Sequence, residues 1–161
     1  MKEPRHGFLA RGGAWVVVQF TLMGAVLGLG VGFRGDGICL PVIVAGAALV
    51  IVGCGLGIAG TVVLGRNLTP FPQPRAGAEL RQRGIYARMR HPLYTGVVLA
   101  LLGWALLWQS AVAFCVALAL LPFFYAKARR EERWLRERFP GYAEYARRVP
   151  RFLPRRRPLT N

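Results

Sequence analysis

Long apolar segments alternate with short polar segments along the chain, and this pattern predicts helices that cross a membrane. The first apolar segment covers residues 13–33 and the second covers residues 38–64, with the glycine-rich turn Arg34–Gly37 between them. Each segment provides the roughly 20 apolar residues that a helix needs to span a bilayer. Inside lipid, backbone polar groups must bond within helices. We therefore expect an all-α integral membrane protein.

A third apolar segment, residues 94–125, is interrupted only by the polar pair Gln109-Ser110. One helix of this length would extend about 48 Å, well beyond the roughly 30 Å hydrocarbon core. Two helices that meet at Gln109-Ser110 fit the bilayer better. The sequence thus predicts a helical bundle of about four spans in one domain, residues 1–161, with the last two spans forming a hairpin. The expected spans are residues 13–33, 38–64, 92–108 and 111–126.

The fourth span is expected to continue beyond the lipid as a cytosolic helix, through about Arg138. The sequence Phe139-Pro140-Gly141 then breaks this helix. Between the second and third spans lies a proline-rich loop, residues 65–74. Such a rigid loop either forms the wall of a site or simply connects two spans.

Glycines recur in the first two spans at spacings that allow close helix packing. Small residues four positions apart form a face on which another helix can lie closely. We expect such faces at the following glycines: Gly24, Gly28 and Gly32 in the first span, and Gly46, Gly53, Gly57 and Gly60 in the second.

Charge sets the expected orientation of the bundle. The chain has 22 Lys and Arg against 7 Asp and Glu, a net charge of +15. The basic segments are the N-terminus, the loop 66–90 and the C-terminal tail, and four spans place all of them on one side. Because positive loops stay in the cytoplasm, we expect both termini there, in the inner membrane of a bacterium. Anionic membrane lipids are expected partners, whereas nucleic acid is not.

The cysteines and histidines do not form a pattern typical of a metal site. Cys39, Cys54 and Cys115 are widely spaced, and the chain has two histidines, His6 and His91. We interpret the cysteines as small buried apolar residues. No metal ligand set is expected. The first apolar segment lacks a clear cleavage site and is interpreted as a retained helix.

The stretch Gly84–Gly96 has the features of an anion site at a helix start. Pro92 suits the first position of the third span, with His91 as its cap. Helix starts carry unpaired N–H groups and partial positive charge, and Arg88, Arg90 and His91 stand just before this one. The alternative is that these basic residues only set membrane topology.

A second polar cluster, Glu131-Glu132, lies beyond the last span. On a helix, Lys127, Glu131 and Leu135 share one face. The two carboxylates either accept hydrogen bonds from a ligand or are solvated charges that balance neighbouring arginines.

These two clusters together resemble the isoprenylcysteine carboxyl methyltransferase family of membrane proteins. The first half of the resemblance is Gly84-x-Tyr86 followed by Arg90-His91-Pro92-x-Tyr94-x-Gly96. The second half is Glu131-Glu132-x-x-Leu135, Phe139-x-x-Tyr142-x-x-Tyr145, Val149-Pro150 and Pro154. The resemblance covers about the C-terminal 95 residues, from Gly65 onward. More distant phospholipid N-methyltransferases share the paired glutamates, and membrane sterol-type reductases, which use NADPH, have a related C-terminal region.

The resemblance implies S-adenosylmethionine as methyl donor, bound by residues 84–96 and 127–154. The donor's carboxylate would lie on the helix start at Pro92 and on Arg90 or His91. Its ribose would lie on Glu131 or Glu132, and its adenine or sulfonium would lie against Tyr86, Tyr94 or Trp134. The expected cofactor-binding residues are Tyr86, Arg90, His91, Pro92, Tyr94, Gly96, Glu131 and Glu132. Candidate catalytic residues are Arg90, His91 and Glu131, although a thiolate or carboxylate acceptor needs no strong base.

The expected function is methyl transfer to a lipophilic or membrane-associated acceptor, such as an isoprenylcysteine-like carboxylate, by O- or S-methylation. Three alternatives stay open: a phospholipid N-methyltransferase, an NADPH-dependent membrane reductase, and a non-enzymatic membrane scaffold. Neither the acceptor nor the oligomeric state follows from the sequence.

Overall fold

The computed structural model describes residues 7–73 and 77–154. In this part of the chain all regular structure is helical, which confirms the predicted all-α class. The α-helices are α1 (Gly13–Gly32), α2 (Leu40–Leu64), α3 (Pro92–Leu107), α4 (Ala111–Arg138) and α5 (Tyr142–Arg148). Two short 3₁₀ helices, η1 (Gly65–Asn67) and η2 (Gly84–Ala87), lie in the loop between α2 and α3.

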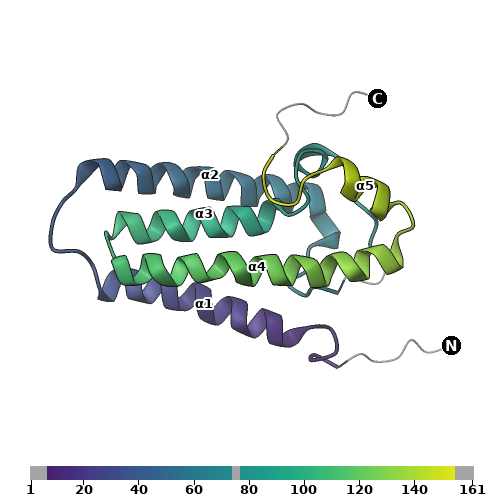
Figure 1. The fold of residues 1–161 in the computed structure, drawn as a ribbon, viewed down its shortest axis with the longest axis horizontal. Helices are drawn as coiled ribbons and strands as arrows, with labels where there is room; N and C mark the ends of the chain where they lie inside the picture. The colour runs from purple at the N-terminus through teal and green to yellow at the C-terminus, as the bar shows by residue number, and fades with distance from the viewer. Residues whose placement is uncertain (1–6, 74–76, 155–161) are drawn as a thin grey trace.

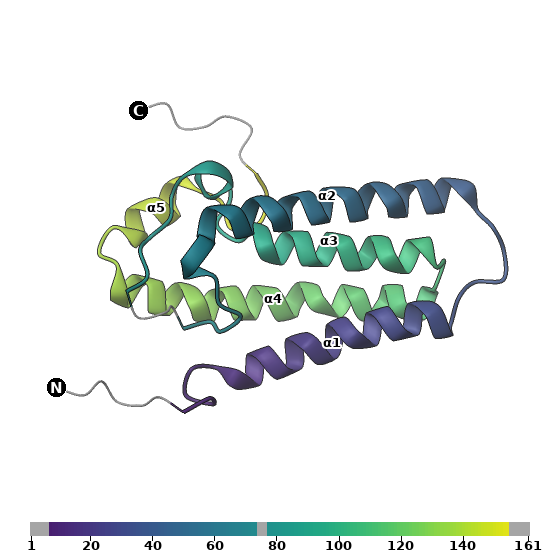
Figure 2. The same cartoon turned by 180° about the vertical axis from the view of Figure 1, so that it is seen from behind.

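Helices α1 to α4 run side by side along the long axis of the molecule (Figure 1). Helix α2 packs on α3, and α1 packs on α4, as the reverse view also shows (Figure 2). Helices α3 and α4 form the predicted hairpin. The start of α1, the end of α2, the start of α3 and the end of α4 all lie at the same end of the bundle, together with α5.

Three of these helices are long and apolar enough to cross a membrane: α1, α2 and α4. Helix α3 has 16 residues and rises about 24 Å, so it is short for a full span. The outward faces of the bundle are apolar, and Ile38, Ile51 and Val62 are more than 70% exposed. An apolar surface of this kind is suited to lipid. We take the membrane segment of α4 to end near Ala126, because charged residues begin at Lys127.

The bundle core lies between α1, α3 and α4. Its buried side chains are Val26, Val98, Leu101, Ala105, Ala113, Ala117, Leu120 and Phe124. At the end of the bundle away from α5, the Gln109 side chain donates to the Gly37 carbonyl (2.6 Å) and accepts from the Cys39 N–H (2.8 Å). These bonds join the two turns, and the Ser110 hydroxyl caps α4 by accepting from Ala113 N–H (3.2 Å).

Glycines hold α2 against α3, whereas no described helix lies on the predicted face of α1. A Cβ placed on Gly53 would lie 2.6 Å from the Gly96 carbonyl oxygen, and one on Gly46 would lie 2.8 Å from the Gly103 carbonyl oxygen. These backbones therefore approach as closely as small residues allow. By contrast, a Cβ on any glycine of the predicted α1 face, Gly24, Gly28 or Gly32, would meet no described atom within 4 Å.

Candidate functional site

The segment after α5 folds back onto the start of α3. The backbone N–H of Arg90 donates to the Pro150 carbonyl (2.9 Å), and that of His91 donates to the Arg151 carbonyl (3.0 Å). One turn later, the Thr95 hydroxyl donates to the Phe152 carbonyl (3.0 Å). His91 is the N-cap residue of α3, as predicted, but its side chain makes no capping bond. The backbone N–H groups of Arg90 and His91 are therefore already bonded within the protein.

Glu132 is the anion that the basic residues before α3 attract. Arg151 binds it with two hydrogen bonds, from Nε to Oε1 and from Nη2 to Oε2, each 2.8 Å long. Glu132 also accepts from His91 Nε2 (3.0 Å), and Arg90 Nη1 lies 3.0 Å from Oε1. The carboxylate is buried. It is thus neither a solvated charge nor free to accept hydroxyls from a ligand.

These contacts determine the protonation state of Glu132. Burial on its own would raise the pKa of this carboxyl. Hydrogen bonds from Arg151 and His91 and the charge of Arg90 outweigh burial, so the pKa falls from its ordinary value of 4.5 to about 2. Glu132 therefore stays ionised across the physiological range. Because a carboxylate only accepts hydrogen bonds, the proton on His91 lies on Nε2.

Glu131 points in a different direction from its neighbour and faces a cavity. It accepts a hydrogen bond from the Tyr94 hydroxyl (2.6 Å), and its side chain is 27% exposed. His91 Nδ1 lies 3.8 Å from the same carboxylate oxygen. The His91 ring stacks on the Tyr94 ring, with centroids 5.1 Å apart and an interplanar angle of 6°. Glu131 therefore keeps one oxygen available to a ligand.

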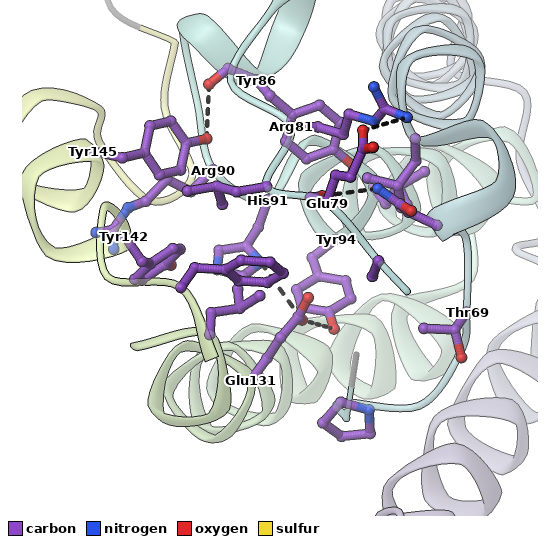
Figure 3. A pocket seen from close by; sticks show the side chains of 18 of the residues that line it. Thr69, Glu79, Arg81, Tyr86, Arg90, His91, Tyr94, Glu131, Tyr142 and Tyr145 are labelled. Carbon is purple, nitrogen blue, oxygen red and sulfur yellow. Dashed lines mark hydrogen bonds and ion pairs between the residues drawn. The ribbon is translucent and has the colours of Figure 1, made fainter. Parts of the chain in front are cut away.

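The cavity lies at the end of the bundle, between the start of α3, the charged part of α4, α5 and the loop after α2 (Figure 3). Thr69, Phe71 and Pro72 line it, so the proline-rich loop does wall a site. The predicted residues Tyr86, Arg90, His91, Tyr94 and Glu131 converge on it. The other lining residues are Leu64, Asn67, Ala78, Glu79, Leu80, Arg81, Leu93, Leu135, Phe139, Tyr142 and Tyr145.

Tyr142 and Tyr145 are cavity residues to which the sequence assigned no role. Their place in the family spacing was a signal that could have identified them. Tyr145 donates to the backbone carbonyl of Tyr86 (2.7 Å). Within the described residues, the buried Tyr142 hydroxyl and Arg90 Nε make no well-aligned hydrogen bond, although the Arg90 guanidinium lies beside the Tyr142 hydroxyl. Burial raises the pKa of both tyrosines, so their hydroxyls remain donors at neutral pH.

Four residues expected at the cofactor do not line this cavity: Glu132, Pro92, Gly96 and Trp134. Glu132 is held by Arg151, as described above. Pro92 is buried as the first residue of α3, and Gly96 faces α2, where a Cβ would lie 2.6 Å from the Gly53 carbonyl oxygen. The Arg130 guanidinium lies over the Trp134 ring, with its central carbon 5.0 Å from the ring centroid. In this structure these four residues contact the protein around the cavity and do not line it.

A second, apolar groove begins on the other side of Tyr94. Its volume is about 240 Å³, and it runs between α3 and α4. Its lining residues are Tyr94, Thr95, Val98, Leu99, Leu102, Leu121, Phe124, Phe152 and Leu153. Tyr94 is the one residue of the described chain that lines both spaces. A polar site at the bundle end thus adjoins an apolar groove between membrane helices.

Curated relatives include proteins of two kinds. The chain is 36% identical over 153 residues to the cobalt-zinc-cadmium resistance protein CzcN of Cupriavidus metallidurans, covering 89% of this chain and 63% of that protein. It is 34% identical to the nickel-cobalt-cadmium resistance protein NccN of Alcaligenes xylosoxydans xylosoxydans, covering 68% and 51%. It is 32% identical to protein-S-isoprenylcysteine O-methyltransferase B of Arabidopsis thaliana, covering 68% and 57%. The chain thus spans between half and two thirds of each of these relatives.

A family model described as phospholipid methyltransferase matches residues 41–141, which is more than half of the chain. The match begins in α2 and ends just before α5, so it includes the start of α3 and both glutamates. The name of the Arabidopsis relative agrees with the isoprenylcysteine methyltransferase family that the two sequence clusters resemble. The chain therefore belongs to the phospholipid methyltransferase family.

Proposed function

We propose that this protein transfers a methyl group from S-adenosylmethionine to a lipophilic acceptor at the membrane surface. The observation that supports this most directly is the position of Glu131 and Tyr94. Glu131 offers a carboxylate inside a polar cavity, and Tyr94, bonded to it, separates that cavity from an apolar groove. A polar cofactor and an apolar acceptor would meet at this boundary.

The cavity has the groups that the cofactor requires. The outward oxygen of Glu131 suits the ribose hydroxyls, because a carboxylate accepts from a diol. The faces of Tyr86 and Tyr94 suit adenine or the sulfonium. Arg90 Nε and the Tyr142 hydroxyl, neither of which makes a well-aligned hydrogen bond in the described part of the chain, suit the carboxylate of the methionine part. Bound there, the cofactor supplies an electrophilic methyl group.

The loop after α2 must move outward before the cofactor can enter. The cavity volume is about 110 Å³, whereas small-molecule sites have volumes of about 300–1,000 Å³. In the described part of this loop, Asn67 donates within the loop to the Glu79 carbonyl (2.8 Å), and the Pro70 carbonyl accepts from Lys127 of α4 (2.9 Å). We expect these loop residues, rather than α3 or α4, to adapt to the cofactor.

Methyl transfer depends mainly on the alignment of the acceptor atom with the methyl carbon and the sulfur. The acceptor atom attacks the methyl carbon in line with the sulfur, so one bond to carbon forms as the carbon–sulfur bond breaks. A carboxylate or thiolate acceptor is already ionised, and positioning supplies most of the acceleration. For an amine or alcohol acceptor, such as a phospholipid amine, His91 Nδ1 and Glu131 are the candidate bases because both face the cavity.

The basic segments support an orientation with the site in the cytoplasm. The loop 66–90 and the charged end of α4 lie at the same end of the bundle as the site. By the positive-inside rule, this end faces the cytoplasm. We infer that both termini lie there and that the membrane is the inner membrane of a bacterium.

Two relatives are named for metal resistance, and we do not extend that role to this chain. Among residues 7–73 and 77–154, no three His, Cys, Asp or Glu side chains are grouped so that they could hold a metal ion. Our proposal therefore stays with methyl transfer, to which the family and the Arabidopsis relative both point.

Cofactor binding tests the proposal against its alternatives. We expect S-adenosylhomocysteine, but not NADPH, to raise the melting temperature of the purified protein in detergent. Glu131→Gln should weaken that binding roughly ten- to a hundred-fold, the effect of losing a charge-assisted bond. Glu137→Gln, an exposed glutamate on the same helix, is the matched control and should have no effect. Binding of NADPH alone would indicate a reductase, and binding of neither compound would favour a scaffold.

A further inference from the structure

A third hollow lies between the start of α1 and α4, and the proposed reaction makes no use of it. Its volume is about 390 Å³. None of its residues lines the cofactor cavity or the apolar groove. We call it the arginine groove, and its lining residues are Leu9, Ala10, Gly12, Ala14, Trp15, Ala126, Arg129, Arg130 and Arg133.

The arginine groove concentrates uncompensated positive charge. Arg129, Arg130 and Arg133 occupy neighbouring positions on α4, and all three are exposed. In the described part of the chain, none of them lies within 4.0 Å of a carboxylate, whereas other arginines on and near α4 do form ion pairs. Arg130 is packed on Trp134, which restricts its guanidinium. Three close guanidinium groups repel one another, so the groove favours an anion.

The position of the groove selects the kind of anion. Ala126 is the last apolar residue of α4 before the charged part begins. Trp15, in the first turn of α1, contacts Phe123 with ring centroids 5.6 Å apart, and tryptophan is typical of the membrane interface. Leu9, on the groove's edge, is 76% exposed. The groove therefore has an arginine wall at head-group depth and an apolar wall that continues toward the lipid.

We propose that the arginine groove binds the phosphate head group of an anionic phospholipid, with its chains along α1 and α4. Arginine is the side chain best suited to phosphate because its planar fork can donate two parallel hydrogen bonds. The lipid is a bound partner and not the methyl acceptor, because the groove shares no lining residue with the cavity that contains Glu131.

A lipid at this position would strengthen the contact between α1 and the rest of the bundle. Next to the groove, the buried Lys127 of α4 donates to Gln19 of α1 and to the Pro70 carbonyl of the proline-rich loop. Helix α1 is thereby joined to the loop that walls the cofactor cavity. We therefore expect a bound anionic lipid to raise the melting temperature of the whole protein, with or without cofactor.

The test uses the full chain in nanodiscs of phosphatidylcholine with increasing phosphatidylglycerol. Each arginine near an anionic head group contributes about fivefold in affinity. Arg129→Gln with Arg133→Gln should therefore weaken phosphatidylglycerol binding about 25-fold and abolish the rise in melting temperature. The control is Arg34→Gln with Arg138→Gln, which removes the same charge from outside the groove. It should leave the phosphatidylglycerol affinity and the rise in melting temperature unchanged.

Three results would overturn the proposal. Equal weakening in the control would mean that net charge, and not the groove, attracts the lipid. Binding of glycerol phosphate as tight as binding of phosphatidylglycerol would mean a site for soluble anions. Unchanged lipid affinity in the groove variant would remove the site altogether. Arg129→Lys with Arg133→Lys keeps the charge but removes the planar forks, so it should weaken phosphatidylglycerol binding less than the glutamine pair does and more than the control does. It decides the question if the glutamine variant does not fold, because unchanged affinity in the lysine pair would contradict the proposal.

Discussion

Arg151 binds both carboxylate oxygens of Glu132, with two hydrogen bonds of 2.8 Å. The first residue lies in the segment after α5 and the second lies in α4, and His91 at the start of α3 binds the same carboxylate. Three separate parts of the chain thus meet at one buried charge. The neighbouring Glu131 is then the carboxylate that remains for a ligand. Adjacent glutamates of identical chemistry therefore have different roles, which their surroundings determine.

Glu132→Gln should destabilise the fold. The substitution leaves the Arg151 and Arg90 guanidinium groups without their counter-charge, although Arg151 is partly exposed and regains some water. We expect a loss of about 2–3 kcal/mol in the free energy of unfolding. Chemical unfolding in detergent measures it. Glu137→Gln is the control and should stay within about 0.5 kcal/mol, and an equal change in both variants would contradict the structural role of Glu132.

The contribution of Glu132 should also depend on pH. Its pKa is lowered from 4.5 to about 2 in the folded protein. A lowered pKa stabilises the fold fully above the ordinary value and loses this contribution as pH falls through the folded value. The stability difference between wild type and Glu132→Gln should therefore be constant near neutral pH and shrink below pH 4.5. Unfolding measured between pH 7 and pH 2.5 tests this, and a constant difference throughout would contradict it.

The fold could be predicted from the sequence because its determinants are local. Apolar runs indicate the helices, and the polar pair Gln109-Ser110 indicates the hairpin. Neither prediction needs information about which helices pack against each other. The glycine pattern shows the limit of such reasoning. Gly46 and Gly53 meet α3, whereas a Cβ on Gly24 or Gly28 would meet no atom within 4 Å in the part of the chain that the structure describes. A glycine face indicates that a helix can approach, and only the bundle shows whether one does.

The site was predicted in part for a similar reason. The motifs identified residues on both sides of the cavity, including His91 and Glu131, some 40 positions apart. They did not identify Arg151, because its contact depends on the backbone of the last segment pairing with Arg90 and His91. In a chain with 22 Lys and Arg, no local feature distinguishes that arginine. The filled anion position at the start of α3 was missed for the same reason.

Tyr94→Phe should separate the stacking of the Tyr94 ring from the hydrogen bond of its hydroxyl. The phenylalanine keeps the ring that stacks on His91 and Phe124, and it removes the hydroxyl that orients Glu131 (2.6 Å). We expect S-adenosylhomocysteine affinity to fall about fivefold to tenfold, the usual effect of one hydrogen bond. Calorimetric titration measures this. In a Glu131→Gln background the same substitution should have a much smaller effect, and full additivity would show that Tyr94 does not act through Glu131.

The last prediction concerns the buried hydroxyl of Tyr142, which lies beside the Arg90 guanidinium but makes no well-aligned hydrogen bond within the described residues. A buried polar group without a well-aligned hydrogen bond destabilises a fold, so Tyr142→Phe should leave stability unchanged or slightly raised. If this hydroxyl binds the cofactor's carboxylate, the same change should weaken S-adenosylmethionine binding about tenfold or more. Decarboxylated S-adenosylmethionine, which lacks only that group, should bind wild type and variant alike.

Tyr145→Phe is the matched control for this prediction. Its hydroxyl donates to the Tyr86 carbonyl (2.7 Å), so its removal should cost about 1 kcal/mol of stability without discriminating between the two ligands. Two ligands and two proteins form a double cycle whose coupling isolates the contact between Tyr142 and the carboxylate. A coupling near zero would mean that the carboxylate binds elsewhere in the cavity. Arg90→Ala is less informative, because Arg90 also lies 3.0 Å from Glu132 and its loss would disturb the fold and the ligand together.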